Sequence, residues 1–423
     1  MNTNEHTLAA HVGLDWADRA HAVCLQAADS TTAEPSVLPQ QPEALAAWAL
    51  ALQERFGGRP VGVCLEQSRG PVVYALSAYP WLVLYPVNPK SLAAFRLALH
   101  PSRSKDDPTD AALLCELLRL HGAQLHPWQA EDAATRMLRG LLEQRDKLVD
   151  DRTRLSHRLR AALKLVFPQA LDWAGPLTQP VSWDFLRRWP SLAELQQATA
   201  AELQQFCTAH HIRRGRRCAA LYAAAQAARP LVTDAAVVQP TVLLIGTLCR
   251  QLPELHAGIV AHDQRIAELF TQHPEHALFA GLPGAGPVLA PRLLVAFGSD
   301  RTRYPDAGTL QQLSGIAPVT ERSGRACWIH WRWAAAPFLR QTFHEYALHS
   351  QAKSAWARAY YRLQRQRGKS HQAAVRALAF KWIRVLFRCW QSRTPYDETR
   401  YLAALRRHQA PLLQLLPQPK EAA

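Results

Sequence analysis

The 423-residue sequence predicts an α/β domain at the N-terminus, a long helical segment in the middle and a mainly α-helical C-terminal domain. Three observations support this fold class. Strand-like and helix-like segments alternate over residues 1–125, a seven-residue leucine repeat follows, and amphipathic helical segments fill the rest. A chain of this length usually forms more than one hydrophobic core and therefore more than one domain. We expect domains at 1–125, 126–270 and 271–395, followed by a tail at 396–423.

Short apolar runs that end in polar turns predict the strands of the N-terminal domain. Residues 11–27 (HVGLDWADRAHAVCLQA) contain two strands around a turn, and residues 60–68 and 81–89 each contain one more. Helical patterns follow at 91–99 and 107–122. Strands that alternate with helices indicate a partly parallel sheet covered by helices.

An apolar stripe at helical spacing predicts one long helix over residues 130–168, which proline ends. Its repeat of Leu141, Leu148 and Leu155 is typical of a coiled-coil arm. Between residues 170 and 270 we expect amphipathic helices that prolines break, namely Pro180, Pro190, Pro230, Pro240 and Pro253.

The C-terminal domain begins with FAGLPGAGPVLAPRLLVAFG at 279–298, which has two interpretations. The segment resembles a helix-hairpin-helix, in which N–H groups at a helix N-terminus bind phosphate. It equally suits a tight turn between packed helices. We expect the tail after Leu405 to be weakly ordered, because prolines recur in it.

Cysteine usage and apolar content exclude several classes of protein. The eight cysteines have neither CxxC nor Cys/His spacing, so we expect buried, reduced thiols and no zinc site. No apolar stretch has the pattern of a membrane span, and the N-terminal residues lack the layout of a secretory signal. These features predict a cytoplasmic protein without a membrane partner.

The distribution of charge indicates a polyanionic partner. The chain has a formal net charge of +15. Residues 301–423 hold 21 Lys and Arg against 6 Asp and Glu, so the whole excess lies there. Positive charge concentrated in one region is typical of nucleic-acid binding. We therefore expect the C-terminal domain to contact DNA and the protein to associate with the nucleoid.

Four carboxylates have the positions of a metal site. Asp15 follows a predicted strand, Glu66 closes another, and Asp107 and Asp110 share one face at the start of a helix. Adjacent strand ends in a ribonuclease-H-like fold would bring such acids together, and carboxylate oxygens suit Mg²⁺. Helix capping is the alternative, because an aspartate before a proline has the pattern of an N-cap. Asp106 competes with Asp107 as the first metal-binding acid of the final pair.

A serine in the C-terminal domain has basic neighbours. Ser323 lies between Arg322 and Arg325, whose guanidinium groups suit phosphate, so it is a candidate nucleophile for a phosphodiester. A turn is the alternative interpretation of Ser-Gly, and Ser314, in a second such pair, is the weaker candidate. Further basic residues, interleaved with aromatic ones, are expected to contact the nucleic-acid backbone: Arg332, Arg340, Arg365, Arg367 and Lys369.

The order of these segments resembles one family over nearly the whole chain. The sequence is similar to the DEDD-type transposases of insertion sequences (insertion-sequence family 110, 1111-like branch). The matching segments are residues 12–23, 64–76 and 85–114 for the N-terminal domain, and residues 282–294, 304–324, 330–347 and 367–387 for the C-terminal domain.

The resemblance implies a RuvC-like N-terminal domain whose four metal-binding acids fall on Asp15, Glu66, Asp107 and Asp110, with Mg²⁺ or Mn²⁺ as the cofactor. Ser323 falls on the family's catalytic serine. The resemblance also implies DNA recombination guided by a structured non-coding RNA. The helical arm would form a homodimer and the synaptic complex a tetramer, with each active centre shared between protomers.

Three functions are compatible with the sequence. The first is a transposase that cuts and rejoins DNA through a phosphoserine link. The second is a RuvC-like junction endonuclease that hydrolyses DNA with two metal ions and no serine. The third is a catalytically inactive product of a mobile element that only binds nucleic acid.

Overall fold

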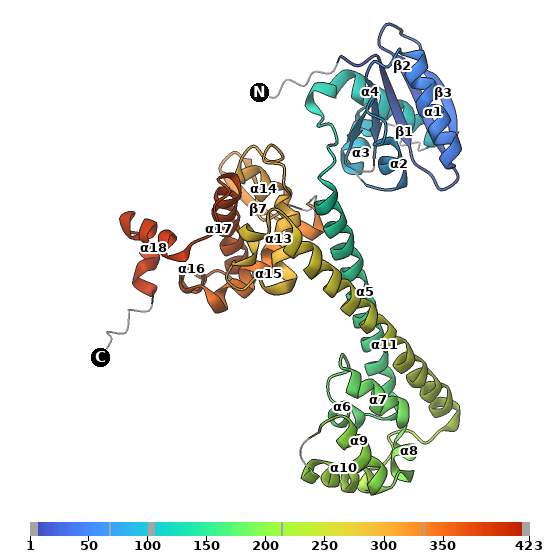
Figure 1. Cartoon of the computed structure of the whole chain (residues 1–423), viewed down its shortest axis with the longest axis vertical. Coiled ribbons are helices and arrows are strands. Elements are labelled where there is room, and N and C mark those ends of the chain that lie inside the picture. Colours follow the sequence, from blue (N-terminus) through green and yellow to red (C-terminus); the bar gives the residue numbers. More distant parts are fainter. Residues whose placement is uncertain (1–6, 67–68, 100–105, 213–214, 333–334, 417–423) are drawn as a thin grey trace. The chain divides into compact units, whose positions relative to one another are not determined.

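The computed structural model describes residues 7–66, 69–99, 106–212, 215–332 and 335–416. The chain divides into two compact units, Met1–Ala130 and Glu131–Ala423 (Figure 1). Separate hydrophobic clusters form the core of each unit.

The first unit is built on a five-stranded mixed sheet of β1 (Ala10–Asp15), β2 (Ala20–Ala27), β3 (Glu34–Pro39), β4 (Val61–Leu65) and β5 (Leu82–Pro86). The strand order is β3-β2-β1-β4-β5. Strand β1 pairs antiparallel with β2 and parallel with β4, and β5 extends the parallel side. The predicted partly parallel sheet is confirmed, and its topology is compatible with a ribonuclease-H-like domain.

The edge strand β3 is absent from the sequence prediction. Its sequence EPSVLP contains two prolines, which cannot donate to a strand ladder and are therefore confined to edges and strand ends. Only Leu38 in this strand is buried, so the strand lacks the apolar pattern that identifies the others. Strand β4, by contrast, is buried at every position, as its uninterrupted apolar sequence predicts.

Helices α1 (Pro42–Arg55), α2 (Pro71–Leu76), α3 (Pro89–Leu99) and α4 (Asp107–His121) cover the two faces of this sheet (Figure 1). The predicted helices at 91–99 and 107–122 correspond to α3 and α4. Helices α1 and α2 share a core with Leu14 and Leu65. Because side chains alternate along a strand, Gly13 and Cys64 belong to the opposite face, where Cys64 packs with α3 and α4.

Two long antiparallel helices, α5 (Ala133–Val166) and α11 (Ala235–Gln272), dominate the second unit (Figure 1). The predicted helix over 130–168 is confirmed as α5. Its leucine stripe packs within the chain: Leu148 contacts α11 at Gly258, and Leu155 packs against a buried cluster that α11 shares. Arg145 of α5 also donates to Asp263 of α11 at 2.5 Å. The coiled-coil stripe therefore has a partner in the same chain.

Between these helices lie α6 (Ala170–Trp173), α7 (Pro180–Arg188), α8 (Leu192–Gln197), α9 (Ala200–Ala209) and α10 (Gly215–Ala227). Cys207 and Cys218 form a disulfide, with their Cα atoms 6.7 Å apart. The expectation that all cysteines are reduced is therefore wrong for this pair. The packing of α9 against α10 brings the two thiols together, which their spacing in the sequence does not reveal. Buried free thiols, as expected, are found at Cys24, Cys64, Cys115 and Cys249, but Cys327 on the hairpin is exposed, so the expectation is wrong there.

Two of the predicted helix breaks are also wrong, because α11 continues through Pro240 and Pro253. A proline inside a helix costs roughly 3 kcal/mol, and the apolar face that α11 buries against α5 and α7 offsets this cost. By length and composition alone, α11 could cross a membrane. The sequence prediction treated this stretch as short and interrupted.

The rest of the second unit is mainly helical, as predicted. It contains one two-stranded hairpin, β6 (Val319–Ser323) and β7 (Ala326–His330). Trp356, Trp382 and Trp390 are fully buried in its core. The helices are α12 (His276–Ala280), α13 (Gly286–Phe297), α14 (Ala307–Leu313), α15 (Pro337–Lys353), α16 (Ala355–Gln366), α17 (His371–Gln391) and α18 (Glu398–Arg407), and a 3₁₀ helix follows, η2 (Pro411–Leu415).

The structure decides between interpretations at both ends of this region. A Cβ atom at Gly284 would lie 2.6 Å from the carbonyl oxygen of His349, so the turn before α13 packs directly on α15. This contact supports the tight-turn interpretation of residues 279–298. The expectation of a weakly ordered tail is wrong up to residue 416, because Leu405 of α18 and Leu412 of η2 are buried in the core.

Candidate functional site

Two of the predicted acids are neighbours at the ends of parallel strands. Strands β1 and β4 pair with Leu14 opposite Leu65, so the next residues, Asp15 and Glu66, lie at the same level. Neighbouring strands are about 4.8 Å apart, and residues at one level direct their side chains to the same face. The register therefore places Asp15 beside Glu66, on the face that α3 and α4 cover.

Helix α4 crosses β1 in close contact. A Cβ atom at Gly13 would lie 1.9 Å from the carbonyl oxygen of Ala111, so a larger residue would displace the helix. One turn farther along α4, the Cys115 thiol donates to the carbonyl oxygen of His11 at 3.2 Å. These two contacts show that α4 runs antiparallel to β1. The first turn of α4 therefore lies toward Asp15.

The helix cap is Asp106, not Asp107 as the capping alternative assumed. The Asp106 carboxylate accepts a hydrogen bond from the backbone N–H of Thr109 at 2.8 Å. Hydrogen bonds from the side chain and the backbone of Thr109 hold the pKa of Asp106 below its usual value. Asp107 is the first residue of the helix and is exposed. Capping therefore does not explain Asp107.

Asp110 is buried and paired with an arginine that the sequence analysis did not identify. Its side chain is 3% exposed, and its Oδ1 atom accepts from Nε and Nη2 of Arg96 on α3 at 2.8 and 2.6 Å. A buried carboxylate needs such compensation, because an unpaired buried charge is strongly unfavourable. The only sign of Arg96 in the sequence is its position as the one cation in the apolar segment SLAAFRLAL.

Among the described residues, no group of three or more His, Cys, Asp or Glu side chains is arranged to hold a metal ion. The carboxylate of Asp110 is directed to Arg96, with which it forms an ion pair. The donors themselves suit Mg²⁺, since two strand ends and one helix turn present carboxylate oxygens. A divalent cation bound at Asp110 would therefore lie close to the positive charge of Arg96.

Ser323 ends β6 at the tip of an exposed hairpin. Gly324 and Arg325 form the turn, with Gly324 at a φ of 58°, a value that favours glycine. The turn interpretation is thus confirmed, and the exposed Ser323 side chain is accessible to a substrate. Because side chains alternate along a strand, Arg322 is directed to the opposite face from Ser323.

Ser314 is in a very different environment. Its side chain is fully buried at the end of α14, and its hydroxyl donates to the carbonyl oxygen of Gln311 at 3.1 Å. A nucleophile must reach its substrate, so the structure favours Ser323 over Ser314.

The predicted nucleic-acid contacts fall into two places. Arg332 and Arg340 are partly buried near the base of the hairpin, where Arg340 donates to the carbonyl oxygen of Arg332 at 2.8 Å. Arg365, in the last turn of α16, and Arg367 and Lys369, which follow that helix, are exposed. Arg365 also donates to the carbonyl oxygen of Lys369 at 2.8 Å, which holds this turn together.

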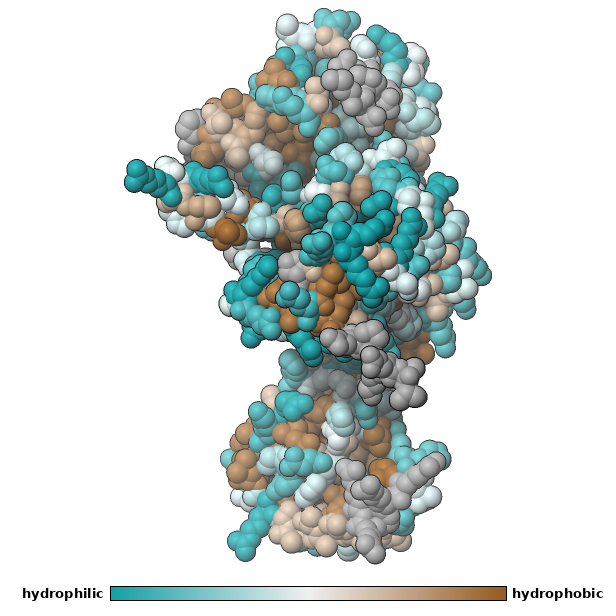
Figure 2. Space-filling view, turned by 90° about the vertical axis from the view of Figure 1, so that its left-hand side faces the viewer, coloured by the Kyte–Doolittle hydropathy of each residue, from teal (hydrophilic) through white to brown (hydrophobic). Residues whose placement is uncertain are grey.

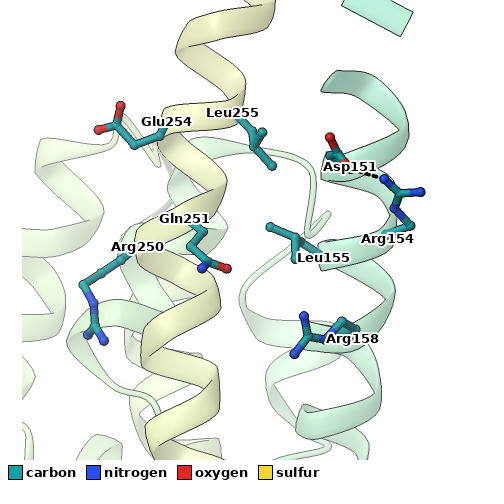
Figure 3. A pocket seen from close by; sticks show the side chains of 8 residues that line it. All are labelled: Asp151, Arg154, Leu155, Arg158, Arg250, Gln251, Glu254 and Leu255. Atoms are coloured by element: carbon teal, nitrogen blue, oxygen red, sulfur yellow. Dashed lines mark hydrogen bonds and ion pairs between the residues drawn. The ribbon is translucent and has the colours of Figure 1, made fainter. Parts of the chain in front are cut away.

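A cavity of about 620 Å³ lies between α5 and α11, where Leu155 and Leu255 point toward each other (Figure 3). Its rim has charges of both signs, including Asp151, Arg158 and Arg250. None of the predicted site residues lines it, so it is not the candidate active site. On the face shown in Figure 2, exposed hydrophobic residues are interspersed with hydrophilic ones, as is normal for protein surfaces.

Sequence comparisons connect both units to one family. A family described as "Transposase" matches residues 12–168, and the "Transposase IS116/IS110/IS902 family" matches residues 276–362. The first match contains the four acids and the whole of α5, and the second contains Ser323.

Relatives cover most of the chain. The IS117 mini-circle protein of Streptomyces coelicolor is 28% identical over 421 residues, which are 95% of this chain and 98% of the relative. The IS110 insertion-element protein of the same organism is 31% identical over 72% of this chain and 76% of the relative. The IS900 insertion-element protein of Mycobacterium paratuberculosis is 28% identical over 71% of this chain and 75% of the relative. The chain therefore belongs to the IS116/IS110/IS902 family of transposases.

Proposed function

We propose that this transposase cuts and rejoins DNA at an active centre that combines the acids of a RuvC-like domain with Ser323. The observation that best supports the acidic half is the register of β1 and β4, which puts Asp15 beside Glu66 near the first turn of α4. The exposed position of Ser323 at a hairpin tip supports the other half.

In this proposal the Ser323 hydroxyl is the nucleophile. Its Oγ atom bonds to the scissile phosphorus, the bond from phosphorus to one DNA oxygen breaks, and the seryl proton passes to water. The departing DNA oxygen takes up a proton. Rejoining reverses these steps, because a DNA hydroxyl attacks the phosphoserine and Ser323 recovers its proton. Arg325, in the turn beside Ser323, would neutralise charge on the phosphate, whereas the side chain of Arg322 is directed to the opposite face of the strand.

The acids would hold Mg²⁺, or Mn²⁺ in its place. When bound, the cation supplies positive charge that stabilises the attacking and leaving oxygens. Asp15 and Glu66 would be ligands from the sheet, and Asp107 and Asp110 would be ligands from α4. The positive charge of Arg96, which contacts Oδ1 of Asp110, would oppose loading of the site.

We further propose that a structured guide RNA selects the DNA sequence, as the resemblance implies. The excess of positive charge in residues 301–423 supports a protein that mainly binds nucleic-acid backbones while base pairing provides specificity. The arm would form a homodimer through surface that α11 leaves uncovered, and two dimers would form the synaptic tetramer. The enzyme would act at the nucleoid in the cytoplasm.

The serine mechanism is tested with Ser323→Ala. We expect DNA rejoining to fall by at least about 1000-fold, as for loss of other nucleophiles, and the denaturation-resistant protein–DNA adduct to disappear. DNA binding, measured by mobility shift, should be retained. Thr320→Ala is the matched control, because it removes an exposed hydroxyl from the opposite face of the same strand.

Each other outcome selects another function. If Ser323→Ala cleaves DNA as the unsubstituted protein does, the serine mechanism is wrong and a two-metal junction endonuclease is favoured. If Ser314→Ala instead abolishes the adduct, the nucleophile is Ser314. If the unsubstituted protein binds DNA without cleaving it in Mg²⁺ or Mn²⁺, even with the RNA of its own element present, it is an inactive element product.

A further inference from the structure

Two arginines lie against the Trp331 ring at the base of the hairpin, and the backbone of Arg332 joins them. The guanidinium carbon of Arg376, on α17, lies 4.2 Å from the centre of the Trp331 ring, and that of Arg340, on α15, lies 5.7 Å from it. Arg332 is the next residue in the chain, and its carbonyl oxygen accepts from Arg340 at 2.8 Å. Cation–π contacts of this kind hold guanidinium groups in a fixed orientation.

No carboxylate balances this cluster within the part of the chain that the structure describes. The Nε atoms of Arg332 and Arg340 are buried without a hydrogen-bond partner there. Arg376 is also partly buried, and this burial lowers its pKa. Arg292 is the contrasting case, because its buried guanidinium lies 3.6 Å from Asp146 and 3.5 Å from Glu345.

The backbone keeps space for the cluster at Gly315. A Cβ atom at this position would lie 3.1 Å from both Nε and Nη2 of Arg340 and 2.5 Å from the Cβ atom of Ala335. The φ of Gly315 is 68°, which few other residues adopt. Arg340 is therefore held between a glycine backbone and the Trp331 ring.

We propose that Arg340 and Arg376, held at Trp331, form a binding site for a phosphodiester group of a nucleic-acid backbone. Partly buried cations without carboxylate partners need an anion, and guanidinium groups bind phosphate through paired N–H groups. This site deepens the proposed function and rests on it for its relation to Ser323. Ala326, opposite Ser323, is five residues from Trp331, so along an extended strand the site lies about 17 Å from the hairpin tip. It would hold the backbone about five nucleotides from the serine.

The test uses the full chain with Arg376→Gln, and Arg388→Gln as the matched control on the same helix. Arg388 is exposed and lies outside the cluster. Binding of a DNA duplex and of an RNA hairpin is measured as a function of salt. We expect Arg376→Gln to weaken binding roughly ten-fold and to reduce the slope of log affinity against log salt by about 1. Arg388→Gln should change neither by as much.

The two arms distinguish the source of the phosphate. Loss on the duplex assigns the site to DNA, and loss on the hairpin alone assigns it to RNA. If Arg376→Gln and Arg388→Gln have equal affinities and slopes for both ligands, the proposal is overturned. Arg376→Lys, which keeps the charge, serves if the glutamine variant unfolds, and it should keep the salt slope but lose affinity.

Failure of this proposal is separable from failure of the serine mechanism. Ser323→Ala should bind both ligands with an unchanged salt slope, whereas Arg376→Gln should still form the covalent adduct at saturating DNA. A binding defect in Arg376→Gln therefore stands even if Ser323 proves not to be the nucleophile.

Discussion

The pairing of Arg96 with Asp110 is the residue-scale feature that most affects the acidic site. Asp110 is 3% exposed on its side chain and Arg96 is 15% exposed, so both charges are largely removed from water. Truncating one partner of such a pair leaves the charge of the other unbalanced. A metal cation in place of the arginine would still balance the charge of Asp110. Arg96 therefore stabilises the metal-free domain and competes with the proposed metal.

This competition gives a prediction for Arg96→Gln. Without the guanidinium group, the free energy of unfolding of the metal-free protein should fall by about 3 kcal/mol, because Asp110 stays buried. Affinity for Mn²⁺ should rise, since the positive charge of Arg96 no longer opposes a cation at Asp110. Thermal unfolding with and without Mn²⁺, together with direct titration, measures both effects.

Arg55→Gln is the control for Arg96→Gln, because it breaks an exposed ion pair with Glu34 in the same unit. It should change the stability little and the metal affinity not at all. Equal Mn²⁺ affinity in Arg96→Gln and the unsubstituted protein would show that Arg96 does not compete with a cation.

At the scale of elements, the start of α5 is anchored by a network of polar side chains. Asp132 caps the helix through Thr135 and also accepts from Ser299 of the C-terminal region. Thr135 in turn contacts His273, just beyond α11, at 3.0 Å. The network ties both long helices to the segment after α13. Its stability should depend on pH, because two of its members titrate.

The direction of this pH dependence follows from the two pKa shifts. Burial opposes ionisation of Asp132, but hydrogen bonds from Ser299 and Thr135 outweigh it, so the net shift of its pKa is downward. Burial lowers the pKa of His273 from 6.5. At both groups, the unfolded chain therefore binds its proton at a higher pH than the folded chain does. Acidification thus favours the unfolded state, and the free energy of unfolding falls. The loss begins below about pH 6.5 for His273 and below about pH 4 for Asp132.

Substitutions at Asp132 test this assignment. Asp132→Ala removes the cap and should cost about 1 kcal/mol near pH 7. Asp132→Asn keeps a cap without the charge, so it should cost less and should remove the pH dependence below about pH 4. Denaturant unfolding at several pH values gives both quantities. If the stability of Asp132→Asn falls with decreasing pH as steeply as that of the unsubstituted protein, the role assigned to Asp132 is wrong.

At the scale of the whole molecule, the acids and Ser323 belong to two different compact units. The proposed function shares each active centre between protomers. A mixture of Asp15→Asn and Ser323→Ala chains tests this arrangement, because each variant alone lacks one half of the centre. In a mixed dimer, an active centre with intact acids and an intact serine can form only if the acids of one protomer act together with the serine of the other.

We expect the mixture to recover about a quarter of the unsubstituted activity, since half of the random dimers are mixed and one of their two centres is complete. Strand cleavage on a labelled duplex measures this recovery. Co-expression ensures that the protomers exchange. If the mixture stays inactive although mass spectrometry detects mixed dimers, both halves come from one chain.

The sequence alone determined the features that local periodicity encodes. Apolar runs of strand length located β1, β2, β4 and β5, the apolar stripe located α5, and the charge count assigned the basic region to residues 301–423. Strand β3 was missed because its prolines and exposed residues lack a periodic pattern. The positions of Asp15, Glu66 and Ser323 also followed from the sequence, because each lies at an end of a strand or a turn.

Only the tertiary structure decided which groups meet across long separations. Arg96 reaches Asp110 because α3 packs beside α4, and Arg376 reaches Trp331 because α17 lies near the base of the hairpin. Packing likewise paired Cys207 with Cys218 and carried α11 through two prolines. These outcomes depend on burial and charge compensation between distant segments. Composition and periodicity record only what neighbouring residues prefer.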